Sequence, residues 1–323
     1  MAELDTRGQL TLIELAKRTN NKELLTIAEV LNEDNEILTD AVWQQANDIT
    51  SHVFTQRTSL PTGSWRQINK GVEEEASSTR QIREPIGILE AFSKVDCVLV
   101  DNAPNPVQFR SDEDMSFVEG LSQNMVEKIF YGNLATDPEQ LNGLANRESY
   151  NNLASENVWG ASGTGSDLCS VWIVQWGARK TSLVYPRGSQ TMGVKRTDLG
   201  KSVAYDASYN PFMAYWSNFV VNIGLVVHDD RNIQRICNIE STGSTNIFDE
   251  DLLIKALNHM PGRGRGASIY MNETLLSQMD IVAKDKTNVY WTPGNAFGEE
   301  VVFFKGIPVR KVDQLTITED AIV

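Results

Sequence analysis

The chain has 323 residues, of which 41% are hydrophobic and 22% are charged, a composition that is typical of a folded globular protein and excludes a wholly disordered one. It carries 29 Lys and Arg against 43 Asp and Glu, a formal charge of −14. Phosphate backbones are bound by clustered basic side chains, so this acidic balance argues against tight, sequence-independent binding to nucleic acid. No apolar segment is long enough to span a bilayer and the first residues lack the apolar core of a signal peptide, so neither a membrane protein nor a secreted one is expected.

Residues 1–49 are predicted to form an arm that carries short helices. Leu12, Leu15 and Ala16 recur at helical spacing, and a second stripe of this kind begins at Leu24. Helices this short are marginal alone in water, so their apolar stripes must dock on a surface. That surface belongs either to the parent domain or to a neighbouring subunit.

Residues 50–84 are predicted to form a long β-hairpin that projects from the body of the protein. The segment is rich in β-forming and turn residues and has few apolar side chains to bury. Its charges come in blocks, with Arg57, Arg66 and Lys70 followed by the acidic run 73–75. A surface loop without fixed structure is the alternative, because a two-stranded hairpin is only marginally stable by itself.

A long amphipathic helix is predicted over residues 111–131. Ser111 is a suitable N-cap, three acidic residues follow in the first turn, and Gly132 is suited to end the helix. The apolar stripe of this helix consists of Met115, Val118, Leu121, Met125, Ile129 and Phe130.

The rest of the chain is predicted to be mostly strand, with two further helices. Strands are expected at residues 170–177, 181–185, 212–239, 301–304 and 307–309, and helices at residues 249–259 and 272–282. The first two strands are separated by a short polar turn and are expected to pair with each other. Together with the long helix, these elements predict an α+β fold.

The three cysteines lie far apart in the sequence, at Cys97, Cys169 and Cys237. An odd number of cysteines without close pairs forms neither a disulfide framework nor a zinc motif. We expect buried, reduced thiols, because free cysteine is among the most buried residue types.

No group of catalytic or metal-binding residues stands out. His52, His228 and His259 do not lie three or four residues from one another, so the helical zinc patterns are missing. The glycine-rich segment 160–166 lacks both the lysine of a phosphate-binding loop and the Gly-x-Ser-x-Gly frame of a nucleophile elbow. We therefore predict no catalytic residue, no cofactor and no metal, and this favours a structural or interaction protein.

Several separated blocks of sequence, taken together and in order, carry a resemblance to a known family. The blocks are Arg57-Thr58-x-Leu60-Pro61, Trp65-Arg66-x-x-Asn69-x-Gly71, Gly143-Leu144-Ala145-x-Arg147, Val174-x-Trp176-Gly177, Tyr185-Pro186-Arg187-Gly188-Ser189, Gly224-Leu225-x-Val227-x-Asp229-x-Arg231, Arg235-Ile236-x-Asn238-Ile239 and Gly306-Ile307-Pro308-Val309-Arg310. In these blocks the chain resembles the major capsid proteins of short-tailed bacteriophages, which are podovirus-type members of the Hong Kong 97-like fold.

The resemblance implies an α+β Hong Kong 97-like capsid fold with four named parts. They are an N-terminal arm (1–49), an extended β-hairpin loop (50–92), a peripheral domain with a long spine helix (93–133 and 200–240) and an axial domain (134–199 and 241–323). In the usual fold the long peripheral strands end the chain, whereas here their counterpart precedes the last helix and the Gly306–Val309 strand. A permuted order of segments is therefore expected.

The resemblance also implies a function, that of a major capsid protein whose copies form an icosahedral shell around the double-stranded DNA genome of a phage. The expected partners are other copies of the chain, as hexamers and pentamers, together with scaffolding, portal and decoration proteins. The DNA is expected to be enclosed without sequence-specific binding, and no membrane is involved. The expected location is the virion capsid, with assembly in the host cytoplasm.

The hairpin is expected to make contacts between subunits, because an arginine can bind a carboxylate of a neighbour in bidentate geometry. The residues expected at such contacts are Arg57, Trp65, Arg66, Lys70, Glu73, Glu74 and Glu75. The alternative for Trp65 is packing within its own hairpin.

Two other functions stay open on the sequence alone. A bacterial nanocompartment shell would have the same fold and would enclose enzymes instead of DNA. A β-rich hydrolase that uses a pair of carboxylates would be a small species with a cleft for its ligand. The acidic balance further predicts a neutral to acidic inward surface of the shell, with basic side chains concentrated at subunit contacts.

Overall fold

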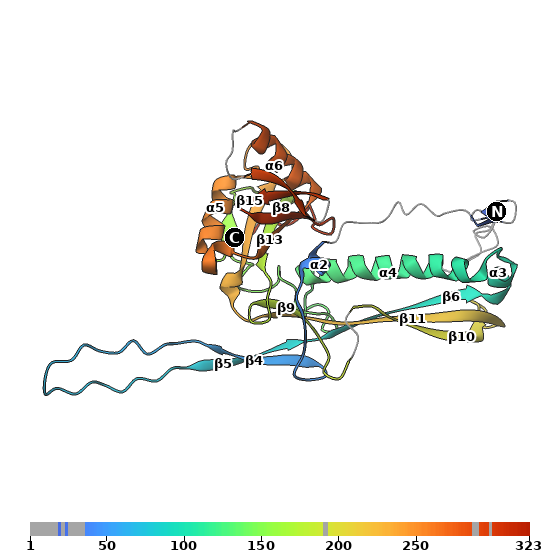
Figure 1. The fold of residues 1–323 in the computed structure, drawn as a ribbon, viewed down its shortest axis with the longest axis horizontal. Coiled ribbons are helices and arrows are strands. Elements are labelled where there is room, and N and C mark those ends of the chain that lie inside the picture. The colour runs from blue at the N-terminus through green and yellow to red at the C-terminus, as the bar shows by residue number, and fades with distance from the viewer. Residues whose placement is uncertain (1–18, 21–22, 25–35, 190–192, 286–290, 297–298) are drawn as a thin grey trace. The chain divides into compact units, whose positions relative to one another are not determined.

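The computed structural model of the chain describes residues 19–20, 23–24, 36–189, 193–285, 291–296 and 299–323 (Figure 1). The chain divides into two compact units. Unit 1 comprises Met1–Asn35, Ile88–Val126 and Gln190–Asn222, and unit 2 comprises Glu36–Gly87, Glu127–Ser189 and Ile223–Val323. Residues 223–240, which the sequence assigned to a peripheral domain, belong to unit 2 in this division. The named capsid domains and the permuted order of segments remain predictions.

The N-terminal arm is described only in part. In unit 1, β1 (Thr19–Asn20) and β2 (Glu23–Leu24) form an antiparallel pair in which Thr19 lies opposite Leu24. Leu24 therefore lies in a strand, although the sequence predicts that a helix begins there, and the turn-forming asparagines before it favour a reversal of the chain at this point. The stripe of Leu12, Leu15 and Ala16 lies outside the described residues.

In unit 1, a sheet packs against the first half of the long helix α4 (Pro106–Tyr131). The strands β6 (Gly87–Asp96) and β10 (Lys195–Tyr205) both pair with β11 (Pro211–Val227). The short helix α3 (Cys97–Asn102) connects β6 to α4 and contributes Leu99 and Val100 to a small core with Phe109 and Tyr215. The rings of Phe117 and Phe219 stack between helix and sheet, with centroids 5.6 Å apart.

The helix α4 begins five residues earlier than the sequence predicts. Pro106 occupies the first helical position, and the Asn105 side-chain oxygen accepts a hydrogen bond from the backbone N–H of Gln108 (3.3 Å). Ser111 thus lies inside the helix and is not its N-cap. Neither α4, with its 26 residues, nor any other helix among the described residues is both long and apolar enough to cross a bilayer.

The end of α4 at Tyr131 is as predicted, and Gly132 explains it. The Gly132 backbone N–H donates to the Lys128 carbonyl at 2.9 Å. A Cβ atom at this position would lie 2.6 Å from the carbonyl oxygens of both Lys128 and Leu141, so only glycine fits. Gly143 packs against it equally closely, because its own Cβ would lie 2.4 Å from the Gly132 nitrogen.

The predicted apolar stripe of α4 is correct only in the second half of the helix. Leu121, Met125, Ile129 and Phe130 are buried, whereas Met115 is 58% exposed and Val118 is 40% exposed. In the first half of the helix, Asp114 and Phe117 face the sheet, through an ion pair of Asp114 with Arg196 and the ring stack of Phe117. The contact face is therefore displaced by one residue from the prediction.

The core of unit 2 surrounds a seven-stranded sheet. In spatial order its strands are β14 (Trp291–Ala296), β15 (Glu299–Phe304), β16 (Ile307–Lys311), β13 (Ala267–Met271), β8 (Leu168–Gln175), β12 (Ile233–Glu240) and β7 (Val158–Gly160). The helices α5 (Glu250–His259) and α6 (Glu273–Asp285) confirm the two predicted helices, and they pack on this core through Leu253, Leu257, Leu275 and Met279. Short 3-10 helices lie at Asp230–Asn232 and Pro261–Gly264.

The strands β8 and β9 (Thr181–Tyr185) do not pair as a hairpin, contrary to the prediction. β8 pairs with β12 and β13, whereas β9 pairs with the end of β11 and, in parallel, with β3 (Trp43–Gln45), which follows α2 (Ile37–Asp40). Every residue of β8 is buried, so this strand needs a neighbour on each side as well as cover on both faces. An isolated bridge joins Trp176, the residue that follows β8, to Thr181 of β9.

A buried ion pair ties the C-terminal segment to the sheet of unit 2. Arg235 Nη2 lies 2.9 Å from Glu319 Oε2, and the two side chains are only 4% and 7% exposed. Arg235 also donates to Ser170 Oγ and to the Tyr150 carbonyl, each at 3.1 Å. The Tyr131 hydroxyl donates to Glu319 Oε1 at 2.7 Å, and burial, reinforced by this carboxylate, raises the pKa of Tyr131. Tyr131 therefore stays protonated, and both charges are held by several partners.

The cysteines are free thiols in the interior, as the sequence predicts. Burial raises the pKa of Cys169 and of Cys237 to about 11. Both thiols are therefore protonated and unreactive near neutral pH.

The Arg235–Glu319 pair generates a prediction about stability. Replacing Glu319 with alanine leaves the Arg235 charge buried without its partner, and breaking a buried pair in this way typically costs about 3–5 kcal/mol. We expect Glu319→Ala to lower the free energy of unfolding of the full chain by that order, measured by urea denaturation. Asp320→Ala is the matched control, because Asp320 is exposed and adjacent in sequence. Equal stabilities of the two variants would contradict a structural role for the pair.

Candidate functional site

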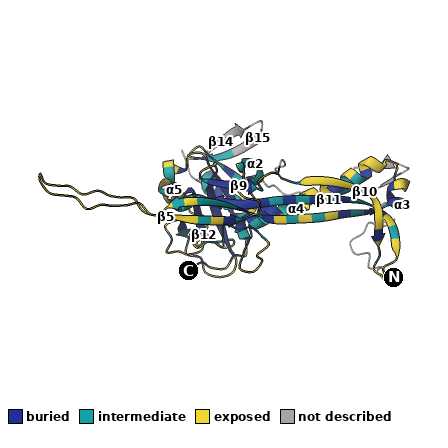
Figure 2. Ribbon diagram, turned by 90° about the horizontal axis from the view of Figure 1, so that it is seen from below, coloured by how far each residue is buried: buried dark blue, intermediate teal, exposed yellow. Residues whose placement is uncertain are grey.

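The candidate site is the hairpin of residues 51–85 in unit 2. β4 (Ser51–Arg57) and β5 (Thr79–Pro85) pair in antiparallel register, with Ser51 opposite Pro85 and Arg57 opposite Thr79. Residues 58–78 join the two strands, and the loop extends well beyond the other elements of unit 2 (Figure 1). Every residue from 57 to 81 is exposed (Figure 2). The predicted hairpin is therefore present. Its paired strands cover only residues 51–57 and 79–85, and the segment between them is a long loop.

Hydrogen bonds between the two sides hold the loop in shape next to the strands. The Thr58 backbone N–H donates to the Ser78 carbonyl at 2.9 Å. The Ser78 hydroxyl lies 2.7 Å from the Thr58 hydroxyl and 2.8 Å from that of Ser59. These contacts extend the hairpin beyond its last paired residues and give the loop a defined base.

Glu75 closes the far part of the loop. Its carboxylate accepts hydrogen bonds from the backbone N–H groups of Thr62 (2.6 Å) and Gly63 (3.0 Å). These two bonds, that from Gly63 first, lower the pKa of Glu75. Gly63 has a φ of +67°, which glycine adopts without strain. Glu75 thus has a partner within its own hairpin, which the sequence did not reveal.

The other residues that the sequence singled out lie on the outside of the hairpin. Arg57 is the last residue of β4, and the loop holds Trp65, Arg66, Lys70, Glu73 and Glu74. Trp65 is fully exposed, so the alternative that it packs within its own hairpin is wrong. Within the described part of the chain, Arg57, Arg66 and Lys70 form no ion pair. The structure brings these residues onto one projecting element, and whether they contact another subunit stays a prediction.

An ion pair at the base of the hairpin fixes β5 to the body of unit 2. Arg147 donates to Glu84 through two parallel bonds, Nη1 to Oε1 at 2.6 Å and Nη2 to Oε2 at 3.1 Å. The side chains of Arg147 and Glu84 are only 11% and 5% exposed. Arg147 Nη2 also donates to the carbonyls of Asn142 (3.0 Å) and Leu225 (3.1 Å). One guanidinium therefore joins β5, the loop before residue 147 and β11.

Gly224 allows β11 to approach the base of the hairpin. A Cβ atom on Gly224 would lie 2.8 Å from the Pro85 carbonyl oxygen and 2.9 Å from a methyl group of Val184. Gly224, Leu225 and Arg147 all belong to the sequence blocks that carry the family resemblance, but Glu84 does not. No local signal marks Glu84 as the partner of Arg147, because the two residues are 63 positions apart.

Two histidines that the sequence treats as unrelated meet at the base of β4. The rings of His52 and His228 have centroids 5.9 Å apart, and Phe54 packs against His228 at 4.6 Å. Gln56 donates to the His228 carbonyl at 3.3 Å. Burial, followed by the charge of His228, lowers the pKa of His52, and burial lowers the pKa of His228. No group of three or more metal-ligating side chains occurs among the described residues, so this pair stands without further ligands there.

Comparisons with known proteins point in one direction. The family model described as Major capsid protein GP7 matches residues 19–323. The structure of bacteriophage Epsilon15 is similar over 100% of this chain and 99% of its own, with 30% identity and a TM-score of 0.72. The capsid of bacteriophage JBD30 is similar over 90% of this chain and 96% of its own, with 9% identity and a TM-score of 0.54, which is a likeness in fold alone. No curated protein sequence matches this one.

The Glu84–Arg147 pair generates a prediction about the base of the hairpin. Arg147→Met leaves Glu84 buried without its partner and should lower the free energy of unfolding by about 3–5 kcal/mol, measured by urea denaturation. The double variant Glu84→Gln with Arg147→Met should recover part of this loss. Arg231→Met is the matched control, since Arg231 is exposed and its partner Asp229 is only partly buried. A loss no greater than that of the control would show that the pair does not hold the hairpin.

The histidine pair generates a prediction about pH. Because the folded protein has lowered pKa values at His52 and His228, the unfolded chain binds more protons below the ordinary histidine pKa of about 6.5. The stability that the pair contributes is present above this pH and is lost as the pH falls through the folded values. Replacing both histidines with asparagine should flatten the decrease in melting temperature between pH 7.5 and pH 5. His259→Asn is the control and should leave the decrease in place, and an unchanged slope in the double variant would contradict the assignment.

Proposed function

The chain belongs to the family of major capsid proteins described as GP7 and is a component of a phage capsid, and from this premise we propose that the hairpin of residues 51–85 joins its copies in the shell. Capsid proteins of this kind assemble with themselves, so each subunit presents the same contacts to several neighbours. Contacts of this head-to-tail type close into a shell when their geometry imposes curvature. The proposal assigns one of these repeated contacts to the hairpin.

The exposure of Trp65 is the observation that carries the proposal. Trp65 is 105% exposed, and Leu60 and Ile68 on the same loop are 69% and 88% exposed. Burying a large apolar side chain fully is worth about 1.5–3 kcal/mol, and tryptophan is common among the residues that dominate interface energies. A loop that displays three such side chains and has no core of its own gains most from contact with another subunit.

Charge supports the same assignment. Arg57, Arg66 and Lys70 form no ion pair within the described part of the chain, in contrast to Arg147 and Arg235, which are buried against carboxylates. Guanidinium groups bind carboxylates in a fixed planar geometry, so they would set the register of the contact as well as strengthen it. Glu73 and Glu74 offer negative charge to a neighbour from the same loop, whereas Glu75 holds the loop itself together.

The finer features of assembly follow the same proposal. Copies of the chain would group as hexamers and pentamers, with scaffolding, portal and decoration proteins as further partners, and assembly would take place in the host cytoplasm. The role is structural and not catalytic, in agreement with the family description. The net charge of −14 suits a container that encloses DNA without gripping it, because packed DNA must move in and out.

The proposal predicts that charge reversal on the hairpin prevents shell formation. The double variant Arg57→Glu with Arg66→Glu should give few or no closed shells in electron micrographs, because two attractive contacts become repulsive in every subunit. Trp65→Ala should weaken assembly in the same direction. Both changes lie at exposed positions, so the melting temperature of the free subunit should stay close to that of the original chain.

Lys255→Glu is the matched control, because Lys255 is an exposed basic residue on α5 outside the hairpin. It should assemble as the original chain does. Normal shells from the double arginine variant would refute the role of the two arginines at subunit contacts.

A further inference from the structure

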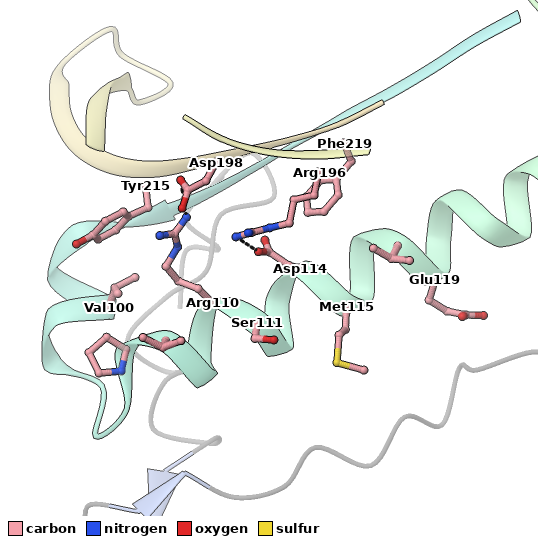
Figure 3. A pocket seen from close by; sticks show the side chains of 13 residues that line it. Val100, Arg110, Ser111, Asp114, Met115, Glu119, Arg196, Asp198, Tyr215 and Phe219 are labelled. Carbon is pink, nitrogen blue, oxygen red and sulfur yellow. Dashed lines mark ion pairs between the residues drawn. The ribbon is translucent and has the colours of Figure 1, made fainter. Parts of the chain in front are cut away.

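A groove with a volume of about 790 Å³ lies in unit 1 along the first half of α4. Figure 3 shows the side chains that line it, from the helix and from the strands above it. Phe219 and Tyr215 of β11 contribute the aromatic part of the lining. Two ion pairs, Arg110 with Asp198 (2.9 Å) and Arg196 with Asp114 (2.5 Å), connect the helix to β10. These charges neutralise each other, so they leave a groove that is mainly apolar.

The helix side of this groove displays apolar side chains that its own unit does not bury. Val107 is 79% exposed, Met115 is 58% exposed and Val118 is 40% exposed. The spacing of 8 and then 3 residues places them on one face of the helix, and at 1.5 Å per residue they extend over roughly 16 Å. Ser111 lies between Val107 and Met115 on the same face and also lines the groove. Exposed apolar side chains that gather in this way on a folded unit typically mark a binding surface.

The N-terminal segment has the matching properties. Residues 10–18 carry the predicted helical stripe of Leu12, Leu15 and Ala16, which is too short to be stable alone and needs a surface. A helix of nine residues is about 13 Å long, close to the length of the exposed stripe on α4. The segment ends where β1 begins at Thr19, and β1 belongs to unit 1, the unit that contains the groove.

The charges of the two surfaces are complementary. Besides Asp114 and Arg110, which are paired with residues of β10, residues 106–120 contain three carboxylates, Asp112, Glu113 and Glu119, and no further basic residue. Residues 7–18 contain Arg7, Lys17 and Arg18 against a single glutamate. Opposite charge of this kind favours the approach of the segment to the helix and fixes its direction.

We propose that the groove of unit 1 holds residues 10–18 of the same chain, with the stripe of Leu12, Leu15 and Ala16 packed on Met115 and Val118. The contact explains why Met115 and Val118, which belong to the predicted apolar stripe of the helix, are not buried by the sheet of unit 1. It is independent of the hairpin contacts proposed above, because it involves neither unit 2 nor a second subunit.

A disulfide cross-link tests the contact directly. In the full-length chain, the double variant Leu12→Cys with Met115→Cys should form a disulfide within one chain on mild oxidation, detected by its mobility without reductant and by mass spectrometry of tryptic peptides. Leu12→Cys alone, Met115→Cys alone, and Leu12→Cys with Ile281→Cys are the controls, since Ile281 is exposed on α6 in unit 2. Cross-linked dimers would place the segment on another copy, and no cross-link at all would exclude the groove. Either result overturns the proposal.

Protease sensitivity provides a second test that does not depend on oxidation. Met115→Asp with Val118→Asp should expose the segment and raise the rate of tryptic cleavage after Lys17 and Arg18 roughly tenfold, which corresponds to about 1.4 kcal/mol of lost binding. Ile281→Asp is the control and should leave the rate unchanged. Leu12→Asp changes only the segment and should have the same effect as the groove variant, even if the groove variant is unstable. An unchanged cleavage rate in Leu12→Asp would refute the docking.

Discussion

The buried ion pair between Glu84 and Arg147 is the interaction on which the projecting hairpin depends. A two-stranded hairpin has no core and is marginally stable alone, so its direction must be fixed at its base. The pair does this with bidentate geometry and with two further bonds from Arg147 to backbone carbonyls. Removing one partner would leave the charge of the other buried and uncompensated, so the two residues stabilise the fold only as a pair. The contact with another subunit that we propose for this loop would benefit from such a rigid attachment, because a mobile base would cost entropy at every contact.

Unit 2 contains two buried ion pairs between an arginine and a glutamate. Arg235 and Glu319 hold the C-terminal segment on the central sheet, as Arg147 and Glu84 hold the hairpin. Both pairs link segments that are far apart in sequence, and both arginines also donate to backbone carbonyls. The arginines of the hairpin differ in that they face solvent. The chain thus has buried basic residues that hold the fold and other basic residues, on the hairpin, that stay exposed.

Much of the fold could be predicted from local sequence. The α+β class, the hairpin, the end of the long helix at Gly132 and the two later helices follow from propensity, capping and periodicity, which act over a few residues. The start of the helix was missed because Asn105-Pro106 is a weaker signal than Ser111 with its acidic neighbours. The pairing of β8 was also missed, since an entirely buried strand has no period that would reveal its partners.

The sequence by itself determined the α+β class, the hairpin, the end of the long helix, the two later helices, the charge balance and the family resemblance of this protein. Only the tertiary structure decided which apolar positions are core, since Phe117 and not Met115 faces the sheet in unit 1. It also decided that Glu84 belongs to Arg147 and that His52 meets His228. The physical reason is that these contacts join residues many positions apart. The free energy of these contacts comes from burial and from charge interactions in the folded chain. Local sequence patterns do not show which distant residues will be buried together.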